Sequence, residues 1–325
     1  MVPYVPTFVY YAIPAAIILY SLRKYRESKW GRCKNKVSLQ GKIVIVTGAN
    51  CGIGYEIAKE FSKRGAKVIL ACRSEDAALN AILKIEKEIN AKQDLVFMEL
   101  DLASLISIKQ FADKINQQYD KIHILVNNAG VSYPDDSDAV TKDGYEIHFG
   151  VNHLGHFFLT NLLLDKLENG NPSRVVIVSS LLHQKGAIEF DSYDKIVGTK
   201  NLYANSKLMN MYFCKELSKK VKDRGINVYA VCPGWVFTSL FRHNMKRIVK
   251  YFVFILPVAF LYMRTANQGA QTAIYCATEP NLSDESGGFY RDCDKFESKV
   301  QFCEVLSKKL WATSVKSIEE SGFKV

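Results

Sequence analysis

The sequence predicts a single-domain α/β protein built on one doubly wound, parallel sheet of seven strands. From Gly41 onward, short apolar runs alternate with stretches of helical periodicity, and a glycine-rich turn follows the first run. Alternation of this kind is typical of βαβ units in a parallel sheet. The runs are apolar throughout rather than at every second residue, which indicates strands buried on both faces.

The expected elements follow in order along the chain. The apolar runs predict strands over residues 42–47, 67–71, 95–100, 122–126, 174–179, 226–231 and 287–290. The helical patterns predict helices over residues 53–64, 77–89, 105–118, about 143–169, and 202–223, and a helical tail after about Lys295. Residues 182–202 form a long connection before the last of these internal helices.

Length and composition exclude several classes of protein. The chain has 325 residues, of which 48% are hydrophobic and 23% charged. This balance is typical of a globular domain and excludes a wholly disordered chain. The apolar runs are too short for a multi-span transporter. Eight cysteines without a CxxC pair predict free thiols in a reducing compartment.

The net charge of +10 is concentrated near the N-terminus. Between Ser21 and Lys36 there are seven basic residues and one acid, Glu27, whereas residues 1–22 carry no charged side chain. This pattern predicts a membrane anchor over 1–22 and a basic juxtamembrane linker over 23–40, with the domain at 41–325 facing the cytosol. Prolines within the anchor leave shallow insertion open. A nucleic-acid partner is not expected, because the basic cluster lies outside the domain.

The turn after the first predicted strand has the spacing of a phosphate-binding loop. It reads T-G-A-N-C-G-I-G, with glycines at 48, 52 and 54. Gly48 permits the tight turn, Gly52 the approach of a pyrophosphate, and Gly54 close helix–strand packing. Asn50, Cys51 and Ile53 would line the same loop. The sequence therefore predicts a Rossmann-like dinucleotide site.

The end of the second predicted strand indicates which dinucleotide binds. An acid there would bind the ribose of NAD, but the chain carries Arg73. A guanidinium can pair with a 2′-phosphate, which favours NADP(H) over NAD. Asp101 and Leu102, after the third strand, would lie beside the adenine.

Polar residues that can carry proton-transfer chemistry follow the later strands. Tyr203 and Lys207 have i, i+4 spacing on one helix, so an ammonium there would lower the pKa of the phenol. Ser179 and Ser180 end the fifth strand. The motifs N-N-A-G at 127–130 and P-G-W-V-F-T at 233–238, together with Asn152, complete the set. Ligands of open parallel sheets bind at this edge.

These motifs, in this order, resemble those of the short-chain dehydrogenase/reductase superfamily. The resemblance covers residues 41–290. The uncharged N-terminus, the D-L-A-S at 101–104, the H-F-G-V-N-H-L-G-H-F at 148–157 and the G-A-Q-T at 269–272 are similar to one branch. That branch contains the microsomal retinol dehydrogenases (retinal reductases) and the related polyprenol dehydrogenase-like proteins.

The resemblance implies a role for each matching residue. Tyr203 would be the general acid/base, Lys207 would lower its pKa and hold the nicotinamide ribose, and Ser180 would polarise the substrate carbonyl. Asn152 would hold a water that relays protons to Lys207. The cofactor cleft would also be lined by Asn128, Ala129, Gly130, Pro233, Gly234, Val236 and Thr238. No metal site is expected.

The substrate side is predicted around an apolar segment, with a lid at about 239–265. Residues 251–263 are uncharged and flanked by basic residues, which favours a membrane-dipping lid for a lipid substrate; an ordinary buried helix is the alternative.

The expected activity is NADP(H)-dependent interconversion of a hydrophobic alcohol and its aldehyde or ketone, with retinal first. Polyprenol or dolichol-type alcohols, fatty or terpenoid aldehydes and sterol ketones are alternatives, and a catalytically silent NADP-binding scaffold is a remote one. The endoplasmic reticulum membrane is the expected location, with lipid droplets and mitochondrial membranes left open. Homodimerisation, frequent in the family, is left open too.

Overall fold

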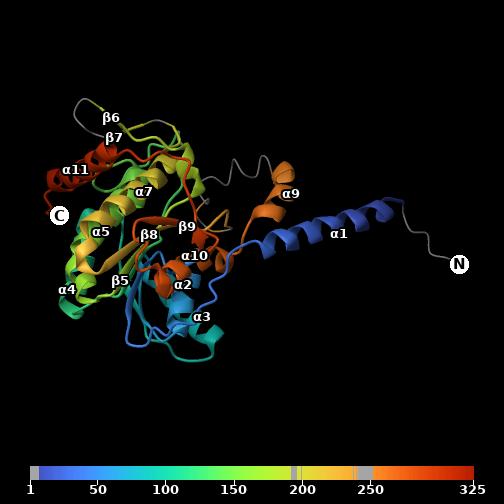
Figure 1. Cartoon of the computed structure of the whole chain (residues 1–325), viewed down its shortest axis with the longest axis horizontal. Coiled ribbons are helices and arrows are strands. Elements are labelled where there is room, and N and C mark those ends of the chain that lie inside the picture. The colour runs from blue at the N-terminus through green and yellow to red at the C-terminus, as the bar shows by residue number, and fades with distance from the viewer. Residues whose placement is uncertain (1–6, 192–195, 199, 237, 239, 241–251) are drawn as a thin grey trace.

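A parallel sheet with helices on both faces forms the body of the protein (Figure 1). The computed structural model describes residues 7–191, 196–198, 200–236, 238, 240 and 252–325. The sheet contains eight strands in the order β10-β9-β8-β5-β4-β1-β2-β3. Their bounds are β1 Ile43–Thr47, β2 Lys67–Cys72, β3 Leu95–Glu99, β4 Ile124–Asn127, β5 Ser173–Val178, β8 Ile226–Cys232, β9 Gly288–Arg291 and β10 Asp294–Lys295.

The predicted doubly wound α/β fold is confirmed. The strands β9, β8, β5, β4, β1, β2 and β3 pair in parallel with their neighbours in this order. They are the seven strands that the apolar runs predict. The two-residue strand β10 is an addition that the sequence analysis does not predict, and it pairs antiparallel to β9. A second antiparallel ribbon, β6 (Glu189–Phe190) with β7 (Ile196–Val197), lies in the long connection before helix α7 (Leu202–Lys220).

Two hydrophobic clusters, one on each face of the sheet, hold the layers together. The first face is covered by α2 (Gly52–Lys63), α3 (Glu75–Ile89) and α10 (Ala266–Thr278). The second is covered by α4 (Leu105–Gln118), α5 (Gly155–Leu162), α7 (Leu202–Lys220) and α11 (Glu304–Glu320). Buried side chains alternate between the clusters along each strand: Ile45 belongs to the second face and Val46 to the first.

The prediction of one long helix over about 143–169 is wrong, because the structure has three shorter helical elements in this range. The Glu146 carboxylate accepts the backbone N–H groups of His148 (2.9 Å) and Phe149 (2.8 Å), so it caps the helical segment from within the predicted helix. The segment then begins with a π-helix, Phe149–Leu154, and continues as α5. A break at Leu163 separates α5 from α6 (Leu164–Asn169). Sequence periodicity does not detect such a cap or a change of helical pitch.

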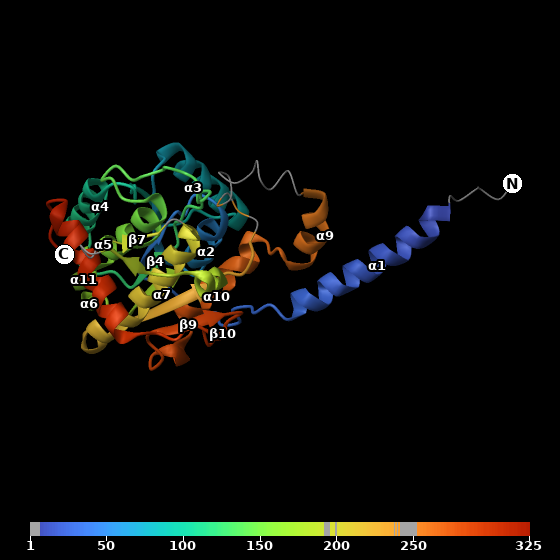
Figure 2. The same ribbon diagram turned by 90° about the horizontal axis from the view of Figure 1, so that it is seen from above.

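The N-terminal helix α1 (Thr7–Ser28) projects away from the sheet in both views (Figures 1 and 2). It continues past residue 22 into the basic stretch. Helix α9 (Phe252–Tyr262) lies beside its C-terminal part. Among the residues that the structure describes, no helix combines the length and the apolarity needed to cross a membrane.

Candidate active site

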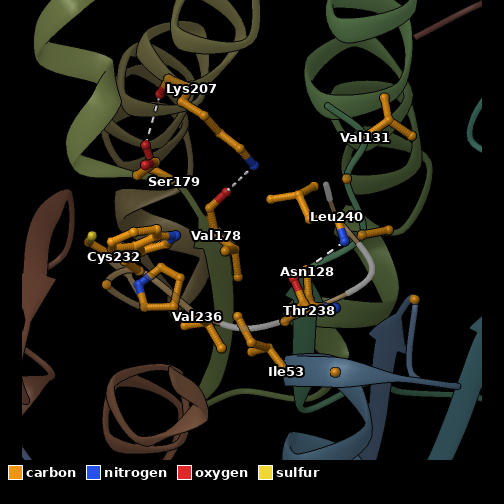
Figure 3. Close-up of a pocket in the computed structure, with 18 of the residues that line it drawn as sticks. Ile53, Asn128, Val131, Val178, Ser179, Lys207, Cys232, Val236, Thr238 and Leu240 are labelled. Carbon is orange, nitrogen blue, oxygen red and sulfur yellow. Dashed lines mark hydrogen bonds between the residues drawn. The ribbon is translucent and has the colours of Figure 1, made fainter. Parts of the chain in front are cut away.

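One large cavity lies at the carboxyl ends of the parallel strands (Figure 3). Its volume is about 910 Å³, which is at the upper end of the range for small-molecule sites. The cavity is lined by the predicted residues Gly48, Asn50, Cys51, Gly52, Ile53, Arg73, Asp101, Leu102, Asn128, Ala129, Gly130, Ser180, Tyr203, Lys207, Pro233, Gly234, Val236 and Thr238. Two other predicted residues, Gly54 and Asn152, are not part of its lining.

The phosphate loop connects β1 to the N-terminus of α2. Gly48 and Gly52 have φ angles of 66° and 59°, the left-handed region in which a side chain is strained. A Cβ on Gly54 would lie 2.4 Å from the Gly48 carbonyl oxygen, so this glycine packs the helix against the loop rather than facing the cavity.

The helix that follows this loop begins at the cavity. Cys51 is the N-cap of α2, and its side chain makes no capping hydrogen bond. The first N–H groups of a helix have no carbonyl partner within it, which favours an anion at this end of α2. Glycines that let a backbone approach closely and a helix N-terminus that favours negative charge together fit the pyrophosphate of a dinucleotide.

Thr47 fixes this loop to the neighbouring N-N-A-G turn. Its Oγ1 accepts the backbone N–H groups of Asn128 and Ala129, each at 2.9 Å. The Asn128 amide in turn donates to the Thr47 carbonyl oxygen at 2.8 Å. The two glycine-containing turns are thus one hydrogen-bonded unit. Thr47 is fully buried, and its role is not apparent from the motif alone.

Arg73 and Asp101, the residues expected at the adenosine end of the cavity, differ in their hydrogen bonds and ion pairs. Arg73 follows β2, is exposed, and has no hydrogen bond or ion pair with any other described residue. Asp101 accepts the Ala103 N–H at 3.1 Å and pairs with Lys142 at 3.0 Å. Among the described residues at this end of the cavity, Arg73 thus keeps its guanidinium unpaired, as a 2′-phosphate site would need.

The two serines after β5 point to different partners. The buried Ser179 hydroxyl donates to the main-chain oxygen of Lys207 at 2.8 Å (Figure 3). Ser180 accepts the Leu182 N–H and forms a side-chain hydrogen bond with Tyr203. Of the two hydroxyls, Ser180 is the one beside the phenol. His183 reaches Ser180 through the main-chain oxygen and not through the hydroxyl, unlike the base of a hydrolase.

Asp135 fixes the start of the helix that carries Tyr203 and Lys207. Its carboxylate accepts the N–H groups of Asn201 (2.8 Å) and Leu202 (3.1 Å) at the N-terminus of α7. Capping of this kind satisfies donors that the helix leaves unpaired. Tyr203 therefore lies one residue after a capped helix start.

The ionisation of the Tyr203–Lys207 pair departs from the expectation. Burial raises the pKa of Tyr203 far above its usual value, and the hydrogen bond with Ser180 opposes this only in part. Burial also lowers the pKa of Lys207 to about 8. The ammonium lies 5.6 Å from the phenol ring centroid and donates to the Val178 carbonyl oxygen at 3.0 Å (Figure 3). In the protein alone, loss of hydration is the largest cause of both pKa shifts.

Asn152 lies behind the cavity wall, within the π-helix. Its amide forms a pair of hydrogen bonds with Val131, accepting its N–H at 2.8 Å and donating to its carbonyl oxygen at 3.0 Å. It also donates to the Ser206 hydroxyl. The Asn152 side chain thus joins the segment after the N-N-A-G turn to helix α7.

The two histidines beside Asn152 have defined partners. His156 Nδ1 donates to the Asn152 carbonyl oxygen at 3.2 Å, and its Nε2 lies 2.9 Å from Thr47 Oγ1. His153 Nε2 lies 3.0 Å from the Ser314 hydroxyl. Burial lowers the pKa of both rings to about 3, so both are neutral. No cluster of metal-ligating side chains occurs in the described part of the chain.

The far end of the cavity brings together two segments that the sequence analysis treats separately. Arg26 and Trp30, from the predicted linker, line it, and the sequence analysis missed both. Val258 and Tyr262 of α9 line it as well, and they belong to the expected lid at about 239–265. Arg264, from the same range, also lines it; it is buried and pairs with Asp292 at 2.6 Å. Phe237, residue 239 and residues 241–251 lie outside the described residues.

The fold and the site define an oxidoreductase of the short-chain dehydrogenase/reductase class. The family described as short chain dehydrogenase matches residues 42–248, and the chain belongs to that family. It is 39% identical to human retinol dehydrogenase 11 over 95% of this chain and 93% of that protein. It is 40% identical to human retinol dehydrogenase 13, with 89% and 88% covered.

Solved structures have the same fold. An uncharacterised protein from Mycobacterium paratuberculosis is 27% identical, with a TM-score of 0.65 over 92% of this chain and 97% of that one. The L-sorbose reductase of Gluconobacter frateurii, solved with NADPH and L-sorbose, has a TM-score of 0.65 at 19% identity, covering 79% and 96%. The predicted family and enzyme class are confirmed.

Proposed function

We propose that this enzyme is a membrane-anchored, NADP(H)-dependent oxidoreductase that interconverts a hydrophobic alcohol and its aldehyde or ketone. Retinol and retinal are the first substrate pair to test. The observation that carries the proposal is the single cavity, which joins the phosphate loop to Ser180 and Tyr203 and then to the side chains of α9. The retinol dehydrogenase names of the relatives support a retinoid substrate.

The proposed cofactor is NADP(H). Arg73 would pair with the 2′-phosphate, the α2 N-terminus with the pyrophosphate, and Lys207 with the nicotinamide ribose. When bound, the nicotinamide supplies or accepts a hydride. A Cβ on Gly130 would lie 3.3 Å from Asn152 Oδ1 and 3.7 Å from the Lys207 ammonium, so a glycine lets this wall of the cavity lie close to both side chains.

The chain itself would manage the proton. Burial keeps Tyr203 protonated, and a protonated phenol can donate to the oxygen of a carbonyl that is being reduced. Ser180 would hold that oxygen in place by a hydrogen bond. Lys207, whose pKa is lowered to about 8, changes charge near neutral pH and can attract the phenolate that remains.

Membrane association is the third part of the proposal. The exposed apolar side chains of α1 include Ile13, Ile17 and Ile18, and those of α9 include Leu256 and Phe260. Exposed groups of this kind favour an apolar environment such as the endoplasmic reticulum membrane. The basic residues after α1 would then face the cytosol.

The test is NADPH-dependent reduction of all-trans-retinal by membranes that carry the full chain. Tyr203→Phe should abolish turnover while NADPH binding, followed by fluorescence, is retained. Tyr275→Phe is the matched control, because it removes a hydroxyl from a tyrosine on α10 that does not line the cavity. Retinal turnover that survives Tyr203→Phe would contradict the proposed mechanism. No turnover with NADPH bound would exclude retinal and direct the assay to polyprenols and other lipid carbonyls.

A further inference from the structure

Arg23 connects the N-terminal helix to α9. Its Nη1 donates to the carbonyl oxygens of Phe260 at 2.6 Å and Met263 at 2.7 Å. These carbonyls belong to the C-terminal end of α9, where a helix leaves its last acceptors without internal partners. A cation at this end is also favoured by the helix dipole. Arg23 therefore caps a helix that lies more than 200 positions later in the sequence.

Glu27 holds the Arg23 side chain in the capping position. The Arg23 Nε donates to Glu27 Oε1 at 2.8 Å, one turn further along α1. The Arg23 side chain is only 12% exposed. Because it is shielded from water, its hydrogen bonds contribute more than those of an exposed ion pair.

Cation–π contacts extend this connection to the wall of the cavity. The guanidinium carbon of Arg26 lies 3.7 Å from the Tyr262 ring centroid. Trp30 lies between two guanidinium groups, at 4.6 Å from Arg23 and 4.8 Å from Arg264. Contacts of this kind add to the attachment, particularly where water is excluded. The end of α1 and the end of α9 are thus one packed unit.

This unit forms the substrate end of the cavity. Arg26 and Trp30 from the N-terminal segment line it together with Val258 and Tyr262 from α9. We propose that the last turns of α1 are part of the substrate site, and that Arg23 is a positioning residue that holds α9 as its wall. The inference rests on the proposed function, since it assigns the apolar part of the lipid substrate to this end.

The matched pair Arg23→Ala and Lys24→Ala tests the proposal. Both changes remove one positive charge and one ion pair with Glu27 from the same helix turn. The Lys24 side chain is 57% exposed and its described contacts are with Glu27 and Tyr20, within α1. Released from its cap, α9 no longer shapes the cavity wall. Arg23→Ala should therefore raise the KM for retinal roughly tenfold with little change in kcat, whereas Lys24→Ala should not.

Two further measurements separate this inference from the proposed function. A short, water-soluble aldehyde does not reach the α9 wall, so its KM should be equal in both variants. Amide hydrogen exchange of the full chain in lipid vesicles should become faster over 252–263 in Arg23→Ala but not in Lys24→Ala. Equal exchange in the two variants would overturn the inference, whether or not retinal is a substrate. Faster exchange without any retinal turnover would refute the proposed substrate and leave the role of Arg23 in holding α9 supported.

Discussion

Thr47 Oγ1 lies 2.9 Å from Nε2 of His156, and both side chains are fully buried. The Thr47 oxygen accepts two backbone N–H groups, and its own proton faces two acceptors, Nε2 of the neutral imidazole and the Val126 carbonyl oxygen at 3.3 Å. The ring then donates through Nδ1 to the Asn152 carbonyl oxygen. This chain of hydrogen bonds joins the phosphate loop, the N-N-A-G turn and the π-helix.

Replacing Thr47 by valine should destabilise the protein without changing its shape. The variant is nearly isosteric, but it leaves the Ala129 N–H and the His156 Nε2 without their partner in a buried site, whereas the Asn128 N–H keeps the Val126 carbonyl oxygen at 3.0 Å. The expected cost is about 2–4 kcal/mol of unfolding free energy, measured by urea denaturation. Thr47→Ser keeps the hydroxyl, so its unfolding free energy should fall much less than that of Thr47→Val. A valine variant as stable as the serine variant would show that the hydroxyl is not needed.

The buried histidines should make the protein sensitive to acid. His153 and His156 have pKa values lowered to about 3, whereas an unfolded histidine takes up a proton near pH 6.5. Between these values the unfolded state binds more protons, so stability is lost as the pH falls below about 6.5. At pH 5 each ring should account for about 2 kcal/mol of that loss.

The measurement is the unfolding free energy of His156→Gln and wild type at pH 7 and pH 5. The difference in unfolding free energy between wild type and His156→Gln should be smaller at pH 5 than at pH 7, because the variant lacks one titrating ring. Phe149→Leu is the control, since it disturbs the same cluster without removing a titratable group. A difference in unfolding free energy between wild type and His156→Gln that is the same at both pH values would contradict the neutral, buried state of the ring.

Cofactor preference should depend on Arg73. Arg73→Ala removes the cation that follows β2, and we expect NADPH to bind roughly 10- to 100-fold more weakly, with NADH affected little. Lys67→Ala removes an equal charge at the opposite end of the same strand and is the control. The measurement is the dissociation constant of NADPH and of NADH for wild type and both variants, followed by cofactor fluorescence. An equal loss for both dinucleotides would argue against a 2′-phosphate site.

Lys207 should make the unfolding free energy of the protein rise with pH above about pH 8. Its pKa is lowered to about 8 by burial, against 10.5 for an ordinary lysine. Between these values the unfolded state holds the proton and the folded state does not, so this lysine makes stability rise with pH. Relative to Lys207→Met, wild type should gain up to about 1.4 kcal/mol per pH unit above pH 8.

Unfolding experiments from pH 7 to pH 9.5 measure this relative gain. Val178→Ala keeps both the lysine and the carbonyl that binds it, so its destabilisation should not vary with pH. If the difference between wild type and Lys207→Met were flat over this range, the lysine would have an ordinary pKa in the folded state.

The part of the site that depends on local spacing could be predicted from the sequence. Gly48, Arg73 and Ser180 each follow a strand that an apolar run reveals, and Tyr203 lies on the helix beside them; parallel strands bring their ends to one edge. The same logic predicts the seven parallel strands. It cannot place β10, because a two-residue strand has no periodicity.

Contacts between distant segments could not be predicted in this way. The cap that Glu146 provides makes the helical segment start later than the predicted residue 143, and the spacing that suggests a helix is unchanged by it. The charge pattern predicts a linker at Arg26 and Trp30, yet these side chains line the cavity. The direction of the Tyr203 pKa shift depends on burial, which residue spacing does not reveal.

The C-terminal helix α11 has a consequence for how the gene tolerates premature stop codons. All described cavity residues precede Asp292, so a chain that ends after β10 would still encode the full chemistry. It would lack Trp311, which packs edge-on against Phe157 at 4.7 Å, and Ser314, the partner of His153. Such a product would expose one face of its core to solvent and to proteases. Nonsense mutations in the last few dozen codons are therefore expected to act by removing the protein from the cell.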